Sequence, residues 1–136
     1  MRMKGQPFEM RSTAIGRMNT QCHTKYSEMT VTIDTKEITD WNSFHHVFKE
    51  TMGFPEFYGA NMNAWIDCMS DIDEPENGMT NKTVKPGETL IILLEDSEEF
   101  VDSCSEIYFA LLDCAAFVNS RKMDEGRQTM IAVVRS

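Results

Sequence analysis

The hydrophobic and polar positions of this chain follow two periods, one of two residues and one of three to four. Residues 29–34 alternate apolar and polar side chains and are rich in β-branched residues, which predicts a strand. Residues 89–94 contain the longest apolar run, which predicts a central strand of a parallel sheet. Residues 129–134 predict a third strand, so three candidate strands are separated by long stretches of a different period.

Two helices are predicted between the first two strands. Thr39 or Asp40 can cap a helix that ends at Gly53. Asn61 can cap a second helix over about 62–72, and the stretch with Pro and Gly between the helices predicts a turn. The expected apolar faces consist of Trp41, Phe44, Val47, Phe48 and Met52 in the first helix and Trp65, Cys68, Met69 and Ile72 in the second.

Two further helices are predicted between the second and third strands. Ser97 can cap a short helix through about Ser103, and Ser103 with Glu106 has the spacing of a capping box for a longer one. The order β-α-α-β-α-α-β predicts an α/β fold with a three-stranded parallel sheet and about four helices on one or both of its faces. The longer helix is expected to bury Ile107, Ala110, Leu111, Cys114, Phe117 and Val118.

Charge and composition divide the chain into two parts. Its 136 residues fit a single domain. Residues 1–28 carry five basic and two acidic residues, a net charge of +3, whereas the remaining 8 basic and 20 acidic residues give −12 over residues 29–136. We expect 29–136 to form the domain and 1–28, which lack a clear period, to be a disordered tail or a non-native extension, with a short ordered arm as the alternative. Residues 73–88 predict a long polar loop, often functional or mobile.

The overall composition excludes several classes of protein. The net charge of −9 argues against direct binding of nucleic acid, because Lys and Arg supply affinity for phosphate. The longest apolar run is far shorter than the roughly 20 residues that a membrane span needs. The four cysteines form no CxxC pair, which favours a reducing compartment such as the cytoplasm. We expect Cys68, Cys104 and Cys114 to be small buried apolar residues.

Neither a cofactor nor a catalytic group is predicted. His45 and His46 are adjacent, so on a helix they would point about 100° apart and could not share a metal. The motifs of phosphate-binding loops, nucleophile elbows and zinc proteases are absent from the sequence. The spacing of the carboxylates selects no catalytic pair. No base is implied beside Cys68 that would make it a nucleophile.

One polar stripe in the second predicted helix has two interpretations. Asn63, Asp67, Asp71 and Glu74 are spaced by four, four and three residues, opposite the apolar face. Such a stripe is either an ordinary solvated helix face or a surface that meets a basic partner. Three carboxylates in line repel each other, which motivates the second interpretation without deciding for it.

The segment FPEFYGANMNAWIDCM at residues 54–69 resembles the signature of the barstar family. The shared pattern is P-E-aromatic-Tyr-Gly-x-Asn-x-x-Ala-x-x-Asp-Cys, which is long and has Gly, Pro and Cys at fixed offsets. The resemblance extends over about 29–136, and the family's three-stranded parallel sheet with helices is similar to the order of elements expected here. The family consists of small intracellular inhibitors of secreted ribonucleases. The 73–88 loop is longer than in barstar itself, and 1–28 has no counterpart.

The resemblance implies which residues contact a partner. The second helix and the loop before it would enter a ribonuclease active site, with acidic side chains in the place of RNA phosphates. By motif position the central inhibitory aspartate is Asp67, which would face the Arg and His residues that bind the scissile phosphate. The loop aromatic falls on Phe57 and the loop amide on Asn61. The contacts at the end of the helix fall on Asp71 and Ile72.

Three positions depart from the family pattern. Asn63 stands where the family has its first acidic residue in the helix, and Ile66 where it has a Trp contact. A glutamate contact of the last helix falls near Asn119. Because one of three expected acidic contacts is kept, we expect a partner with fewer cations than the family's usual ribonuclease.

The resemblance implies a stoichiometric inhibitor of the antitoxin or immunity type from a bacterium, without cofactor and not an enzyme. Its partner would be a basic ribonuclease or nuclease toxin, and the free chain would be a monomer. One alternative is an interaction module with the same fold that binds a non-nuclease protein. Another is a small enzyme that uses carboxylates near the 73–88 loop, which a pair of strongly raised carboxylate pKa values would favour.

Overall fold

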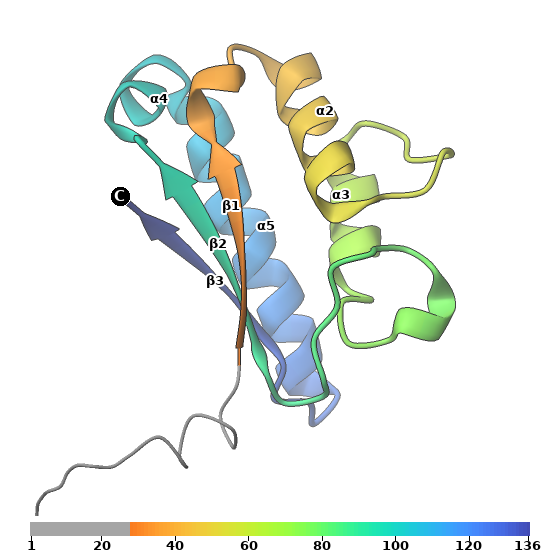
Figure 1. The fold of residues 1–136 in the computed structure, drawn as a ribbon. Coiled ribbons are helices and arrows are strands. Elements are labelled where there is room, and N and C mark those ends of the chain that lie inside the picture. The colour runs from red at the N-terminus through yellow and green to blue at the C-terminus, as the bar shows by residue number, and fades with distance from the viewer. Residues whose placement is uncertain (1–27) are drawn as a thin grey trace, which may run out of the picture.

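The fold is built on a parallel sheet with its apolar strand at the centre (Figure 1). A computed structural model of the chain describes residues 28–136, so the expected tail lies outside the described residues apart from Glu28, which begins the first strand. The strands pair in the order β1-β2-β3, both pairs parallel, as predicted. Their bounds are β1 (Glu28–Asp34), β2 (Thr89–Glu95) and β3 (Met130–Arg135).

Four helices connect the strands in the predicted order β-α-α-β-α-α-β. They are α2 (Trp41–Met52), α3 (Met62–Met69), α4 (Glu98–Ser103) and α5 (Ser105–Asp124). Two short 3₁₀ turns, η1 (Thr35–Glu37) and η2 (Pro75–Asn77), follow β1 and α3. None of the helices within residues 28–136 combines the length and the apolar character that crossing a bilayer requires.

The helices cover one face of the sheet. Alternate residues of the strands point into a core against α2, α3 and α5, and these are Val31, Ile33, Leu90, Ile92, Leu94 and Ile131. On the opposite face Thr30 and Thr32 are exposed, and Val134 is 42% exposed. The sequence left open whether one or both faces would be covered, and in the described part of the chain one face is covered.

Local chemistry sets the ends of α2 as predicted. The Asp40 carboxylate accepts a hydrogen bond from the Ser43 backbone N–H at 2.8 Å and completes a capping box. Gly53 ends the helix with a φ of 70°, a left-handed conformation that glycine adopts without a steric penalty.

The predicted start of α5 is wrong. Ser103 is the last residue of α4, and α5 begins at Ser105 with no side-chain cap. Ser97 precedes α4 as predicted, but its hydroxyl donates to the Ser136 carbonyl at 3.2 Å and does not cap the helix. The Ser97 hydroxyl is thus engaged by a distant part of the chain, which a local pattern does not reveal.

The buried face of α5 also differs from the prediction. Its buried residues are Ile107, Leu111, Ala115, Val118 and Lys122. Phe117 is 50% exposed, because at about 100° per residue it lies about 120° from the centre of that stripe. Ala110, Cys104 and Cys114 are half-buried, whereas Cys68 is buried as expected.

Candidate partner-binding site

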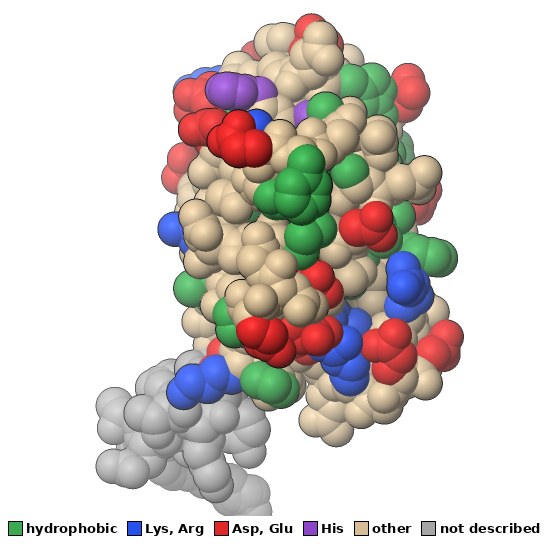
Figure 2. All heavy atoms as spheres, turned by 90° about the vertical axis from the view of Figure 1, so that its right-hand side faces the viewer, with side chains coloured by type: hydrophobic (Ala, Val, Ile, Leu, Met, Phe, Trp, Pro, Cys, Tyr) green, Lys and Arg blue, Asp and Glu red, His purple; other side chains and the backbone are tan. Residues whose placement is uncertain are grey.

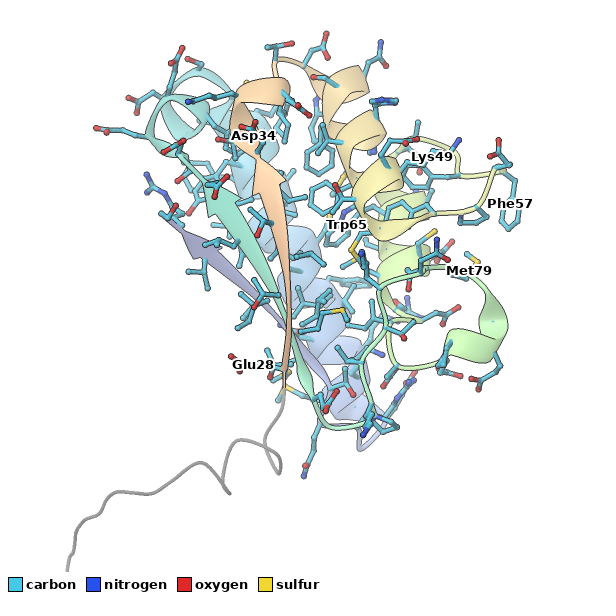
Figure 3. All side chains as sticks on the ribbon, in the orientation of Figure 1. Glu28, Asp34, Lys49, Phe57, Trp65 and Met79 are labelled. Carbon is cyan, nitrogen blue, oxygen red and sulfur yellow. The ribbon has the colours of Figure 1, made fainter. Side chains whose placement is uncertain are left out.

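Helix α3 presents its polar side to solvent because its apolar side is anchored in the core. Asn61 caps the helix, as predicted, by accepting a hydrogen bond from the Ala64 backbone N–H at 2.8 Å. Trp65 is completely buried and packs edge-on against Phe48, with ring centroids 5.8 Å apart. Figure 3 shows Trp65 directed inward between the helices. This orientation leaves Asp67 on the exposed side of α3.

The loop before α3 is anchored by aromatic residues that precede and follow Phe57 in the sequence. The Phe54 and Tyr58 rings lie 4.7 Å apart, and the Tyr58 hydroxyl lies 2.6 Å from Nδ1 of His45 on α2. Burial lowers the pKa of His45 and raises that of Tyr58, so the pair is uncharged near neutral pH. Between these anchors Phe57 is 76% exposed and points away from the fold (Figure 3).

Four of the predicted contact residues line a single groove. Phe57, Asn61, Asn63 and Asp67 come together there, and Met79 of the 73–88 loop closes another side. The side of the molecule that carries α2 and α3 shows hydrophobic side chains exposed among acidic and basic ones (Figure 2). The groove therefore offers apolar and acidic groups close together on one surface.

Asp67 is the free carboxylate of this groove. It is exposed, and within residues 28–136 no hydrogen bond or ion pair engages it. Beneath it, burial raises the pKa of Cys68 to about 11, and the neighbouring Asp67 and Asp71 add to the effect. The Cys68 thiol therefore stays protonated at neutral pH, which makes it a poor nucleophile.

The continuous acidic stripe expected on the second helix does not form. The helix ends at Met69, where the sequence predicted an end near residue 72. The Ser70 hydroxyl donates to the Ile66 carbonyl at 2.7 Å, and the following N–H groups bond three residues back, as in a 3₁₀ turn. Asp71 and Glu74 consequently lie beyond the helix, off the face that carries Asp67.

The acids beyond the helix have partners within the chain. Asp71 is half-buried, and burial raises its pKa although Asn77 donates a hydrogen bond to it. Glu74 forms an ion pair with Arg127 at 2.9 Å. Of the three carboxylates in the predicted stripe, Asp67 is therefore the one available to an external cation.

Two further predicted contacts, Ile72 at the helix end and Ile66 at the position of the family's Trp contact, differ from Asp67 in their surroundings. Ile72 is fully buried in the core, because the 3₁₀ turn directs its side chain inward and away from the surface. Ile66 is half-buried and packs against the same core.

Asn119 on α5 also has an internal role. Its amide donates to the Ile131 carbonyl at 3.0 Å and accepts from the Ile131 N–H at 2.8 Å. These bonds join α5 to β3, an edge strand of the sheet, and they occupy both ends of the amide. Asn119 does not line the groove that contains Asp67.

A family model described as Barstar (barnase inhibitor) matches residues 28–134. The chain belongs to the barstar family. The match runs from the first residue of β1 to Val134 in β3, and it confirms the expected family and its fold. No curated protein matches the chain closely enough to count as a relative.

This barstar-family chain contains a buried ion-pair cluster that sequence reasoning missed. Lys122 of α5 donates to Asp73 at 3.0 Å and to the Ser70 carbonyl at 2.7 Å, and Arg127 also pairs with Asp73. Burial opposes ionisation of Asp73, but the hydrogen bonds from Lys122 and Arg127 hold its pKa below the ordinary range. The available signal was the position of Lys122, four residues after Val118 on the buried stripe of α5.

Asp73, the first residue of the 73–88 loop, is held ionised by Lys122 and Arg127, so its pKa is lowered and not raised. Asp73 therefore does not supply one of the raised carboxylates that the enzyme alternative calls for. Within residues 28–136 no three His, Cys, Asp or Glu side chains are grouped in a way that could hold a metal ion.

Proposed function

We propose that this chain is a stoichiometric inhibitor that covers the basic active site of a ribonuclease or nuclease toxin. The observation that supports this most is the exposed Asp67, which has no ion-pair partner within residues 28–136. It lines a groove with the exposed Phe57, in a family described as barnase inhibitors. An active site that binds RNA must hold cations at the scissile phosphate. A fixed carboxylate can occupy that position, and it contains no bond for the enzyme to cleave.

Charge contributes mainly to the rate of encounter. The net charge of −12 over residues 29–136 attracts a basic protein over a distance set by the ionic strength. Complementary charge raises association rates, and the desolvated contacts determine how slowly the complex dissociates. The barnase–barstar pair is itself a well-known example of such steering. We therefore expect association of this chain with its partner to slow as salt is added.

The proposed contact surface consists of Asp67 at its centre, with Phe57, Asn61 and Asn63 around it and Ile66 at its edge. Asp71, which lies beyond the end of α3, is a peripheral contact in this proposal, because its charge is partly compensated by Lys122 and Arg127. An amide at position 63 can accept a hydrogen bond but cannot neutralise a cation. This composition fits a nuclease with few cations in its active site. We place the protein in the cytoplasm, as a monomer when free.

The decisive experiment isolates the partner and measures its activity. The full chain, with its Asp67→Ala variant as the matched control, captures proteins from native cells, and each captured protein is purified and assayed for nuclease activity. We expect a nuclease that binds the unmodified chain and whose activity falls to zero at one equivalent. A captured protein that lacks nuclease activity, or that stays active with excess chain, would contradict the proposal and support the interaction-module alternative, which the amides at positions 63 and 119 favour.

A further inference from the structure

We propose that the 73–88 loop forms the second wall of the contact groove and that Met79 is a specificity-determining contact residue. Met79 lines the groove together with Phe57 and Asp67 and is half-buried against the core. Figure 3 shows Met79 and Phe57 on the same side of the molecule. The inference rests on the proposed function and adds to it the kind of partner surface that fits.

The wall is held in place by backbone contacts with the rest of the fold. The Asn81 N–H donates to the Met52 carbonyl at 2.7 Å, two residues after Met79. Thr80, between Met79 and this bond, is 6% exposed. On the other side of Met79, the Gly78 N–H donates to a carbonyl within the loop, that of Pro75, at 3.1 Å. The backbone on both sides of Met79 is therefore held by hydrogen bonds.

Gly53 provides the space for this anchoring. A Cβ atom at position 53 would lie 2.3 Å from the Asn81 side-chain amide, so the loop packs directly against the end of α2. The same residue needs its left-handed conformation to end that helix. The C-terminus of α2 and the 73–88 loop thus pack closely against each other. Such packing fixes the position of the loop, as a wall of the groove requires.

The chemistry of the groove defines the partner. Phe57 and Met79 are apolar rims, and the groove also contains the Asn63 amide and the Asp67 carboxylate. An exposed aromatic ring is a typical anchor of protein interfaces, and a methionine thioether adapts to irregular apolar surfaces. A partner that offered cations alone would leave both rims uncovered. The fitting partner is a basic protein that places an apolar side chain beside a cation.

The test compares variants of the full chain against a panel of purified small basic ribonucleases that includes barnase, with dissociation constants from calorimetry at low salt. Met79→Gln removes the apolar rim, Met79→Leu preserves it, and Met123→Gln makes the same change at an exposed methionine of α5 outside the groove. For each ribonuclease that the unmodified chain binds, we expect Met79→Gln to weaken binding about tenfold or more. Met79→Leu and Met123→Gln should stay within about twofold.

Three results would overturn the inference, and they are distinguishable. If Asp67→Ala loses binding while Met79→Gln stays within about twofold, the loop is not a contact wall and the proposed function stands. If Met79→Leu weakens binding as much as Met79→Gln, with unchanged thermal unfolding, the apolar character of position 79 is irrelevant. If both Asp67→Ala and Met79→Gln bind within about twofold of the unmodified chain, the groove is not the contact surface, and the proposed function of this site fails together with the inference.

Discussion

Lys122 donates a hydrogen bond to Asp73 at 3.0 Å, and neither side chain is more than 2% exposed. The same ammonium group donates to the Ser70 carbonyl at the end of α3, so the last helix holds the end of the helix that carries Asp67. Arg127 supplies Asp73 with a second cation. Removing the Asp73 carboxylate would leave both cations without their shared partner, and one of these cations, Lys122, is fully buried.

Asp73→Asn is therefore expected to lower the free energy of unfolding by about 3–5 kcal/mol, the usual cost of breaking a buried ion pair from one side. Urea denaturation at pH 7 measures this change. Glu125→Gln is the control, because it removes a carboxylate that pairs with Arg127 at the surface, and it should cost less than about 1 kcal/mol. If the two substitutions lowered the free energy of unfolding equally, burial would not increase the contribution of the Asp73 ion pairs to stability.

The second prediction concerns the pH dependence of stability at His45. Burial lowers the pKa of His45 below its ordinary value of 6.5, so below about pH 6.5 the unfolded chain binds a proton before the folded chain does. The free energy of unfolding should thus fall from about pH 6.5 downward, by at most about 1.4 kcal/mol per pH unit, and the effect ends below the folded pKa. Above about pH 7 this group should have no effect.

Urea denaturation at pH 7.5 and pH 5.5 tests this, with His45→Gln as the variant and His46→Gln at the exposed neighbouring position as the control. His45→Gln should show a smaller loss of stability between the two pH values than the unmodified chain, whereas His46→Gln should behave like the unmodified chain. If His45→Gln and the unmodified chain lose the same amount, the His45–Tyr58 pair is not a source of the acid sensitivity.

The third prediction concerns the edge of the sheet. Asn119→Ala removes both hydrogen bonds to Ile131 and leaves the N–H and C=O of an edge strand without these partners. We expect a loss of about 1–3 kcal/mol in the free energy of unfolding, together with self-association through the exposed edge. Denaturation and size-exclusion chromatography with light scattering measure the two effects. Ser120→Ala, an exposed change on the same helix, should show neither.

Local patterns predicted the elements that local forces determine. The period-two and apolar runs located β1 and β2, and the side chains of Asp40 and Asn61 cap their helices as expected. Such caps act within three residues, so a sequence window contains all of the relevant atoms. The three-stranded order followed because helical crossovers between successive strands leave few topologies.

The misses involve contacts between distant parts of the chain. Ser97 bonds to Ser136, and Lys122 pairs with Asp73, which lies 49 residues away. A lysine is normally counted as a polar surface position, so the pattern alone does not reveal that its ammonium group has a buried partner. The early end of α3 has a similar origin, because no local stop signal precedes the turn that buries Ile72. At the candidate site, the motif located Asp67, but Met79 came from a loop whose path only the structure shows.

The fourth prediction concerns Asp67 and separates its contact role from its general charge. Asp67→Ala should weaken binding of the proposed nuclease by about 2–5 kcal/mol, because the opposing cation would be left desolvated without a partner. Asp102→Ala removes the same charge from an exposed position on α4, outside the groove, and should reduce only the association rate.

Stopped-flow association and dissociation measured at two salt concentrations distinguish these effects. The dissociation rate should rise in Asp67→Ala and remain unchanged in Asp102→Ala. An affinity within about threefold of the unmodified chain, which corresponds to roughly 0.6 kcal/mol, would exclude Asp67 as the centre of the interface.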